Sequence, residues 1–252
     1  MTSGTEPTAE LLARRLGDDA LIYGQRLAEW CSRGPTLEED LALTSVALDY
    51  IGRARMYYDY AGSFSGMSED DYAYTRDLRE FSNLLLYELP NGDFAFTMVR
   101  QYLIDEFESL YLGALAAARD EQLAAIAAKA RKETDYHLRR SREWMRRLGR
   151  GTDESARRGN VALSQLWGYL PEFFAMDPAE AELVTVLGAP DRTALEGPWR
   201  SSVATVLADA GLTHPEDDWV VSGGRAGVHT EHLGTLLAEL QFMQRAYPGL
   251  EW

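Results

Sequence analysis

Apolar side chains recur along most of this chain at intervals of three and four residues, which is the spacing of helices with one buried face. Stretches of alternating β-branched residues are nearly absent. The pattern predicts helices at 11–31, 36–61, 71–89, 93–119, 122–148, 161–174, 179–187, 193–210 and 231–247. We therefore predict an all-α helical bundle in a single domain of residues 1–252, with a core at about 11–149 and additional C-terminal helices at about 156–247.

For two of the long helices, the sequence predicts which faces are buried. The segment 93–119 is apolar on nearly every side, which is typical of a helix at the centre of a bundle. The segment 122–148 has basic residues on its outer sides and one stripe that we expect to face the core. That stripe consists of Leu123, Ala127, Ala130, Thr134, His137, Ser141, Met145 and Leu148.

The helix at 36–61 should begin with a capping box at Thr36 and Glu39. One of its stripes consists of Ala42, Val46, Asp49, Arg53 and Met56. We predict from it that Asp49 and Arg53 form a buried ion pair, since an unpaired buried charge costs several kcal/mol. The alternative is a partly exposed helix pair worth about 0.2–0.5 kcal/mol.

Two further predictions concern residues near this helix. Asp105 on the segment 93–119 is a second carboxylate that Arg53 could reach with its two-pronged guanidinium. Tyr57, Tyr58 and Tyr60 surround the end of the helix, so we expect some of them to be exposed and to favour a protein interface.

Composition excludes several functional classes. The formal charge of −15, from 25 Lys and Arg against 40 Asp and Glu, argues against binding nucleic acid. Cys31 is the single cysteine, which excludes an internal disulfide framework and a multi-cysteine metal site. The polar N-terminus does not resemble a secretion signal, and no apolar run approaches the roughly 20 residues of a membrane span. We expect a cytoplasmic protein.

Two sets of side chains resemble metal ligands. In di-iron bundles a Glu and a His three residues apart share one helix face, whereas here His137 is preceded at that spacing by Thr134. Glu133, His137 and Asp105 leave a residual metal site open, although a core histidine held by hydrogen bonds is the favoured interpretation. His229, Glu231 and His232 form the second set, for which we favour helix capping by Thr230 and packing.

Several motifs together resemble a known family over nearly the whole chain. They are Leu16-Gly17-Asp18, Gln25-Arg26-Leu27-Ala28-Glu29-Trp30, Glu80-Phe81-Ser82-Asn83-Leu84-Leu85-Leu86, Leu89-Pro90-Asn91-Gly92-Asp93-Phe94-Ala95, Arg100-Gln101-Tyr102, Tyr136-His137-Leu138-Arg139, His229-Thr230-Glu231-His232-Leu233-Gly234, Pro248-Gly249 and Trp252. The chain resembles the C-type structural subunits of multicomponent phenylacetyl-CoA oxygenases, the ring 1,2-epoxidases of aerobic phenylacetate breakdown.

This resemblance implies a ferritin-like bundle that pairs with a homologous catalytic subunit, which carries the di-iron centre. Small accessory subunits and a reductase with NADPH, flavin and iron–sulfur groups complete the implied complex. The register shared with the catalytic relatives implies that this chain keeps only remnants of the di-iron site. The positions concerned are Ala20, Tyr50, Arg53, Asp105, Thr134 and His137, of which only Asp105 and His137 keep a metal-binding type of side chain.

Three functions therefore remain under consideration. The first, which the resemblance favours, is a non-catalytic subunit that scaffolds the catalytic partner and itself binds no metal or cofactor. The second is an active metal-dependent oxygenase that uses Glu133, His137 and Asp105. The third is a ferritin-like binding protein unrelated to oxygenation.

Overall fold

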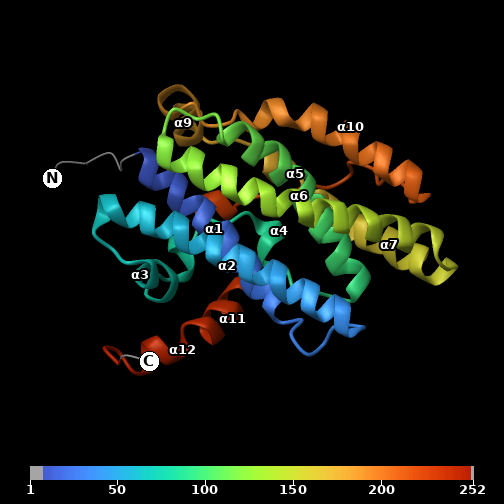
Figure 1. The fold of residues 1–252 in the computed structure, drawn as a ribbon, viewed down its shortest axis with the longest axis horizontal. Helices are drawn as coiled ribbons and strands as arrows, with labels where there is room; N and C mark the ends of the chain where they lie inside the picture. Colours follow the sequence, from blue (N-terminus) through green and yellow to red (C-terminus); the bar gives the residue numbers. More distant parts are fainter. Residues whose placement is uncertain (1–7, 251–252) are drawn as a thin grey trace. The chain divides into compact units, whose positions relative to one another are not determined.

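The computed structural model describes residues 8–250 of the chain (Figure 1). All regular secondary structure in this range is helical, which confirms the predicted all-α, ferritin-like helical bundle. None of the helices in the described range is long and apolar enough to cross a membrane. Trp252 and the first seven residues, which the sequence predictions also used, lie outside the described residues.

The chain divides into two compact units, each described separately below. Within the described range, the first unit takes residues 8–33, 38–90 and 223–250, and the second takes 34–37 and 91–222. The C-terminal segment thus belongs with the N-terminal helices. The prediction of one domain spanning 1–252 stays a prediction.

The first unit is built around two long helices, α1 and α2, with short elements completing it. Its members are α1 (Thr8–Ala28), α2 (Leu37–Ser65, less its first residue), α3 (Glu69–Tyr74), η1 (Leu78–Glu80), α4 (Leu85–Glu88), η3 (Gly224–Ala226), α11 (Glu231–Leu240) and α12 (Phe242–Ala246). α1 packs against α4, and α11 packs against the 3₁₀-helix η1.

The second unit is centred on α5, which packs against α6, α7 and α10. Its helices are α5 (Phe94–Leu115), α6 (Glu121–Arg150), α7 (Asp153–Leu166), η2 (Trp167–Tyr169), α8 (Pro171–Phe174), α9 (Pro178–Leu187) and α10 (Arg192–Ala210). Most of α5 is buried, and all eight residues of the stripe predicted on α6 are buried. Both predictions about these helices are confirmed.

The predicted helix at 71–89 is wrong, because the structure replaces it with α3, η1 and α4 and extended residues between them. In this segment, backbone groups that would bond to one another within a helix instead form hydrogen bonds with side chains from distant parts of the sequence. The amide of Ser82 donates to Asp18, and that of Leu84 donates to Asp19, at 2.9 and 2.8 Å. Gln241 donates to the carbonyls of Ala73 and Arg76, both at 3.0 Å. These partners are remote in sequence, so local periodicity does not register them.

α2 differs from its prediction in how it is rotated. The buried residues are Leu43, Val46, Ala47, Tyr50, Arg53, Ala54, Tyr57, Tyr58 and Ala61, while Asp49 is half-buried. The expectation that some of Tyr57, Tyr58 and Tyr60 are exposed is wrong, because the first two are buried and Tyr60 is half-buried. Tyr58 is held inside because its ring stacks on Tyr72 with centroids 5.2 Å apart.

Candidate functional site

In the second unit, α5 and α6 enclose a polar cluster centred on Asp105. This carboxylate is fully buried. It accepts a hydrogen bond from Gln101 Nε2 at 2.6 Å and another from Ser141 Oγ at 2.7 Å. Gln101 lies one helical turn before Asp105 on α5, and Ser141 belongs to the buried stripe of α6. The two helices thereby fix the position of the carboxyl group.

Burial dominates the protonation of this carboxyl group. Removal from water raises the pKa of Asp105 to about 7, and the nearby charge of Glu108 acts in the same direction. The His137 imidazole and the hydrogen bonds from Ser141 and Gln101 lower the pKa of Asp105 but do not cancel the effect of burial. Asp105 is therefore far more readily neutral at physiological pH than an ordinary aspartate.

The other predicted site residues of this unit lie along the same stripe of α6. His137 and Thr134 are buried, and the Thr134 hydroxyl lies 3.5 Å from a carboxylate oxygen of Glu108. Within residues 8–250, no three His, Cys, Asp or Glu side chains come together in an arrangement that could hold a metal ion. The alternative set of Glu133, His137 and Asp105 therefore does not form a ligand cluster.

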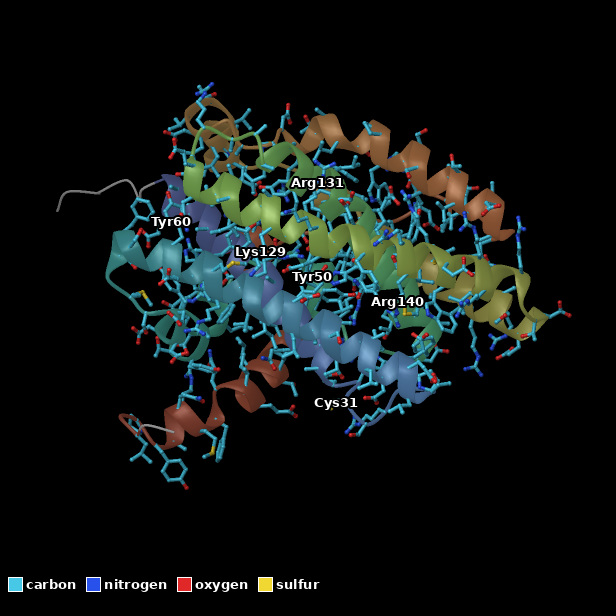
Figure 2. All side chains as sticks on the ribbon, in the orientation of Figure 1. Cys31, Tyr50, Tyr60, Lys129, Arg131 and Arg140 are labelled. Carbon is cyan, nitrogen blue, oxygen red and sulfur yellow. The ribbon has the colours of Figure 1, made fainter. Side chains whose placement is uncertain are left out.

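In the first unit, α1 and α2 carry the three remaining predicted positions. Ala20 is buried and offers only a methyl group. Tyr50, labelled on α2 in Figure 2, is fully buried, and its ring meets that of Tyr23 edge-on with centroids 5.0 Å apart. The Arg53 guanidinium lies over the Tyr50 ring, 4.6 Å from its centroid, and Arg53 is only 2% exposed. The pairing of Arg53 with Asp49 or Asp105 stays a prediction.

These side chains do not fit a di-iron centre. Such a centre draws its ligands from four carboxylates and two histidines supplied by four helices. The positions that the resemblance implies for these ligands hold a methyl group, a phenol, a guanidinium and a hydroxyl, together with one carboxyl and one imidazole. A guanidinium has only donors and a fixed positive charge, so Arg53 opposes a cation at its position.

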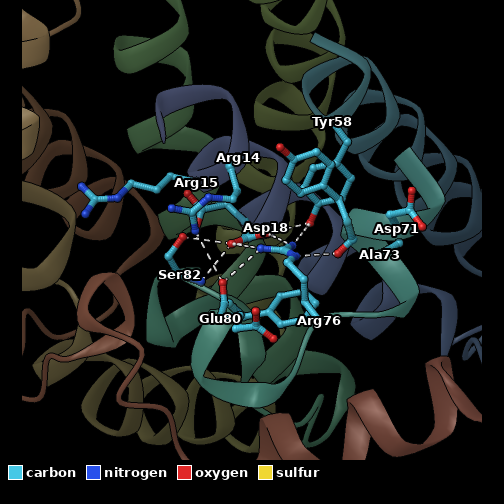
Figure 3. A network of polar contacts seen from close by, with 12 residues as sticks. Arg14, Arg15, Asp18, Tyr58, Asp71, Ala73, Arg76, Glu80 and Ser82 are labelled. Carbon is cyan, nitrogen blue, oxygen red and sulfur yellow. Dashed lines mark hydrogen bonds and ion pairs between the residues drawn. The ribbon is translucent and has the colours of Figure 1, made fainter. Parts of the chain in front are cut away.

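The first unit also contains a buried ion network that sequence reasoning missed, centred on Asp18 of α1 (Figure 3). Arg76 donates to both carboxylate oxygens of Asp18, and the Tyr58 hydroxyl donates to one of them at 2.7 Å. Ser82 donates through its amide and its hydroxyl, each at 2.9 Å. Burial alone would raise the pKa of Asp18, but the charge and hydrogen bonds of Arg76, the charge of Arg14 and the hydrogen bond from Tyr58 together outweigh burial and lower it.

Local sequence holds one signal of this network, in Gly17. A Cβ at this position would lie 2.5 Å from the Tyr58 ring, closer than real side chains approach. Gly17 thus leaves room for Tyr58 to lie against α1 and reach Asp18.

Two further buried acids tie the C-terminal segment into the same unit. Asp19 accepts hydrogen bonds from both terminal nitrogens of Arg225, at 3.0 and 2.7 Å.

The second of these acids is Glu88, which is fully buried. It accepts a hydrogen bond from the Thr230 amide at 2.6 Å and another from Asn83 at 2.8 Å. His229 lies 2.8 Å from Glu88 through Nδ1 and 2.8 Å from the Phe81 carbonyl through Nε2, and these contacts raise the pKa of His229 despite its burial. Thr230 caps α11, as expected.

The whole of this chain, residues 1–252, matches a family described as phenylacetic acid catabolic protein. The chain belongs to this family. It is also similar to the C-type subunit of 1,2-phenylacetyl-CoA epoxidase from Escherichia coli (strain K12), with 46% identity over 239 residues, which cover 94% of this chain and 96% of that one. The resemblance inferred from the sequence motifs is thereby confirmed.

For this member of the phenylacetic acid catabolic family we predict that Asp105→Asn is more stable than the wild type at pH 8, by roughly 1–3 kcal/mol. The folded-state pKa of about 7 lies above the ordinary value of 3.8, so the favourable contribution of the protonated acid is complete below about pH 4 and is lost as pH rises through 7. Asparagine stays neutral throughout. Its amide can donate to Ser141 Oγ, because the Ser141 hydroxyl can itself donate to the Leu138 carbonyl, 3.3 Å away.

Urea unfolding of both proteins between pH 5 and pH 8 measures this effect. The stability difference should shrink toward zero as the pH is lowered. A variant that is instead less stable by more than about 2 kcal/mol at pH 8 would mean that an ionised Asp105 serves a cation. That outcome would support the predicted pairing of Asp105 with Arg53.

Proposed function

We propose that this chain is a structural subunit of a phenylacetyl-CoA 1,2-epoxidase, in which it supports a homologous di-iron subunit and performs no metal chemistry itself. The 46% identity to a C-type epoxidase subunit, over nearly all of both chains, supports the assignment to such a complex. The non-catalytic role is supported chiefly by the Arg53 guanidinium stacked on Tyr50, where the family register would place a histidine and a glutamate.

In this proposal the chemistry occurs on the partner. The catalytic subunit adds one oxygen atom from O2 to the aromatic ring of the CoA thioester. Electrons come from NADPH through the reductase, and small accessory subunits complete the complex. The contribution of this chain is a rigid α-helical body whose buried ion networks hold its surface in one conformation. No residue of this chain is assigned to the substrate or to iron.

Iron content and co-purification test the proposal together. We would express the chain alone and with a tagged homologous di-iron subunit, purify both preparations, and measure iron by mass spectrometry. The expected result is negligible iron in the isolated chain and a stable complex whose iron scales with the catalytic subunit. A full di-iron complement in the isolated chain would establish the metal-enzyme alternative. Failure of the two chains to associate would favour a binding protein unrelated to oxygenation.

Turnover of the reconstituted complex gives a second, sharper prediction. His137→Gln and Asp105→Asn in this chain should each change kcat by less than about threefold, because neither residue touches the reacting atoms. Removing even an outer partner of a working metal site typically costs about 10–100-fold. The matched control makes the equivalent substitutions in the catalytic subunit. A loss of two orders of magnitude on changing this chain would overturn the non-catalytic role.

A further inference from the structure

The outer face of α2 is exposed along most of its length and is apolar near its middle. Between residues 38 and 55, all of which the structure describes, six positions are exposed, at alternating intervals of three and four residues. They are Glu38, Leu41, Ser45, Leu48, Gly52 and Arg55, and we call them the α2 seam. Leu41 is 58% exposed and Leu48 is 64% exposed. This spacing is that of a coiled-coil contact line, whereas the outer face of a surface helix is normally polar.

The side chains of the α2 seam are complementary to those of a second copy of the same helix that runs in the opposite direction. When Ser45 of one helix lies opposite Leu48 of an antiparallel second copy, Leu41 falls opposite Gly52 and Glu38 falls opposite Arg55. Each leucine then faces a small residue, and each charge faces its opposite. A two-fold axis produces every one of these pairs twice, as in any interface between identical surfaces.

Gly52 is otherwise unexplained by the fold of the chain. A Cβ placed on it would meet nothing within 4 Å, and its backbone is helical, so neither packing nor conformation requires a glycine there. Glycine in the middle of a helix is unfavourable because of its conformational freedom in the unfolded chain. Close approach of a leucine from another helix gives Gly52 a purpose, since small residues at a helix crossing let the axes come together.

We propose that the α2 seam is a docking surface for a second copy of this chain, packed antiparallel about a two-fold axis. Charge complementarity identifies this occupant, because Glu38 and Arg55 stand at the two ends of the seam, about 26 Å apart on a helix rising 1.5 Å per residue. Arg55 is 75% exposed, and its Nε donates a hydrogen bond to Glu69 at 2.8 Å. The inference does not depend on the proposed function.

The seam alone is small beside the roughly 1,600 Å² buried in a typical stable interface. We therefore expect a dimer that forms in the micromolar range or above and dissociates on dilution. Sedimentation equilibrium of the full chain, from low micromolar to several hundred micromolar concentration, measures this dimerisation directly. The expected result is a monomer–dimer equilibrium whose dissociation constant rises with salt concentration.

A charge-swap series tests the orientation. Glu38→Arg places two like charges together twice in the dimer, and so does Arg55→Glu, so each variant should weaken dimerisation at least tenfold. The double variant Glu38→Arg with Arg55→Glu restores opposite charges and should recover most of the wild-type affinity. The melting temperature of each dilute monomer serves as the folding control. Recovery in the double variant is specific to antiparallel pairing of these two positions.

Gly52→Leu supplies an independent test based on shape. The variant should fold, because a side chain at this position points into open space, but it should abolish detectable dimerisation. The matched control is Gly234→Leu on α11, where a Cβ likewise meets nothing within 4 Å, and it should dimerise normally.

Three results would overturn the proposal: a strictly monomeric chain at several hundred micromolar, a dimer insensitive to both charge variants and to Gly52→Leu, or charge-swap recovery only in binding to a homologous subunit. The last result would assign the α2 seam to a heteromeric partner.

Discussion

Asp18→Ala should lower the free energy of unfolding by about 3–5 kcal/mol, the usual cost of breaking a buried ion pair. The substitution leaves the Arg76 guanidinium, 6% exposed, without its carboxylate. It also removes the acceptor for the Tyr58 hydroxyl and for the amide and hydroxyl of Ser82. Because Asp18 holds both Arg76 and Ser82, we expect the segment 76–84 to lose protection from hydrogen exchange first.

A double-mutant cycle separates this pair from general damage. Arg76→Ala alone should also be strongly destabilising, whereas Asp18→Ala combined with Arg76→Ala should cost clearly less than the two single effects added together. The control is Asp209→Ala, which breaks an exposed pair with Arg146 and Arg150 and should change stability little. Additive single effects, or a loss below about 1 kcal/mol for Asp18→Ala, would contradict the network as a source of stability.

Arg53→Ala is expected to have an effect of similar size, about 3–5 kcal/mol. The side chain is 2% exposed, and its guanidinium lies on the Tyr50 ring, so truncation leaves a cavity and removes a cation–aromatic contact. Our hypothesis is that Arg53 provides the positive charge that metal ions provide in catalytic relatives, with Asp49 as its counter-ion. Equilibrium unfolding in urea is the measurement.

Two companion variants distinguish packing from charge in this prediction. Arg53→Met keeps much of the volume and removes the charge, so any loss shared by Arg53→Ala and Arg53→Met belongs to electrostatics and hydrogen bonds. Asp49→Asn should reproduce part of that loss if Asp49 is the counter-ion. A loss below about 1 kcal/mol for Arg53→Ala would contradict the hypothesis, because exposed pairs contribute no more than that.

The success of the sequence predictions depended on whether the information was local. α6 was predicted almost residue for residue, because its basic outer face and its stripe through Thr134, His137 and Ser141 form one periodic pattern. α5 was recognised as buried because apolar residues surround it. In both helices the residues that decide the structure are neighbours along the chain, so periodicity alone contains the answer.

The predictions failed where distant side chains decide the backbone. A helix over 71–89 is locally reasonable, but Asp18 and Asp19 draw the amides of Ser82 and Leu84 out of any helical pattern. Tyr58 was one of three tyrosines of which some were expected to be exposed, because its partner Asp18 lies 40 residues earlier and is not visible in the local pattern. Among the candidate site residues, the family resemblance predicted which ligands are missing. It did not reveal the raised pKa of Asp105, which comes from burial between two helices.

The return of the C-terminal segment to the first unit has a consequence for synthesis of the protein. Asp19 and Glu88 are made early, but their partners Arg225 and His229 are made 206 and 141 residues later. Until then these two native contacts cannot form, so we expect the first unit to complete its packing only after the segment 223–250 has been made.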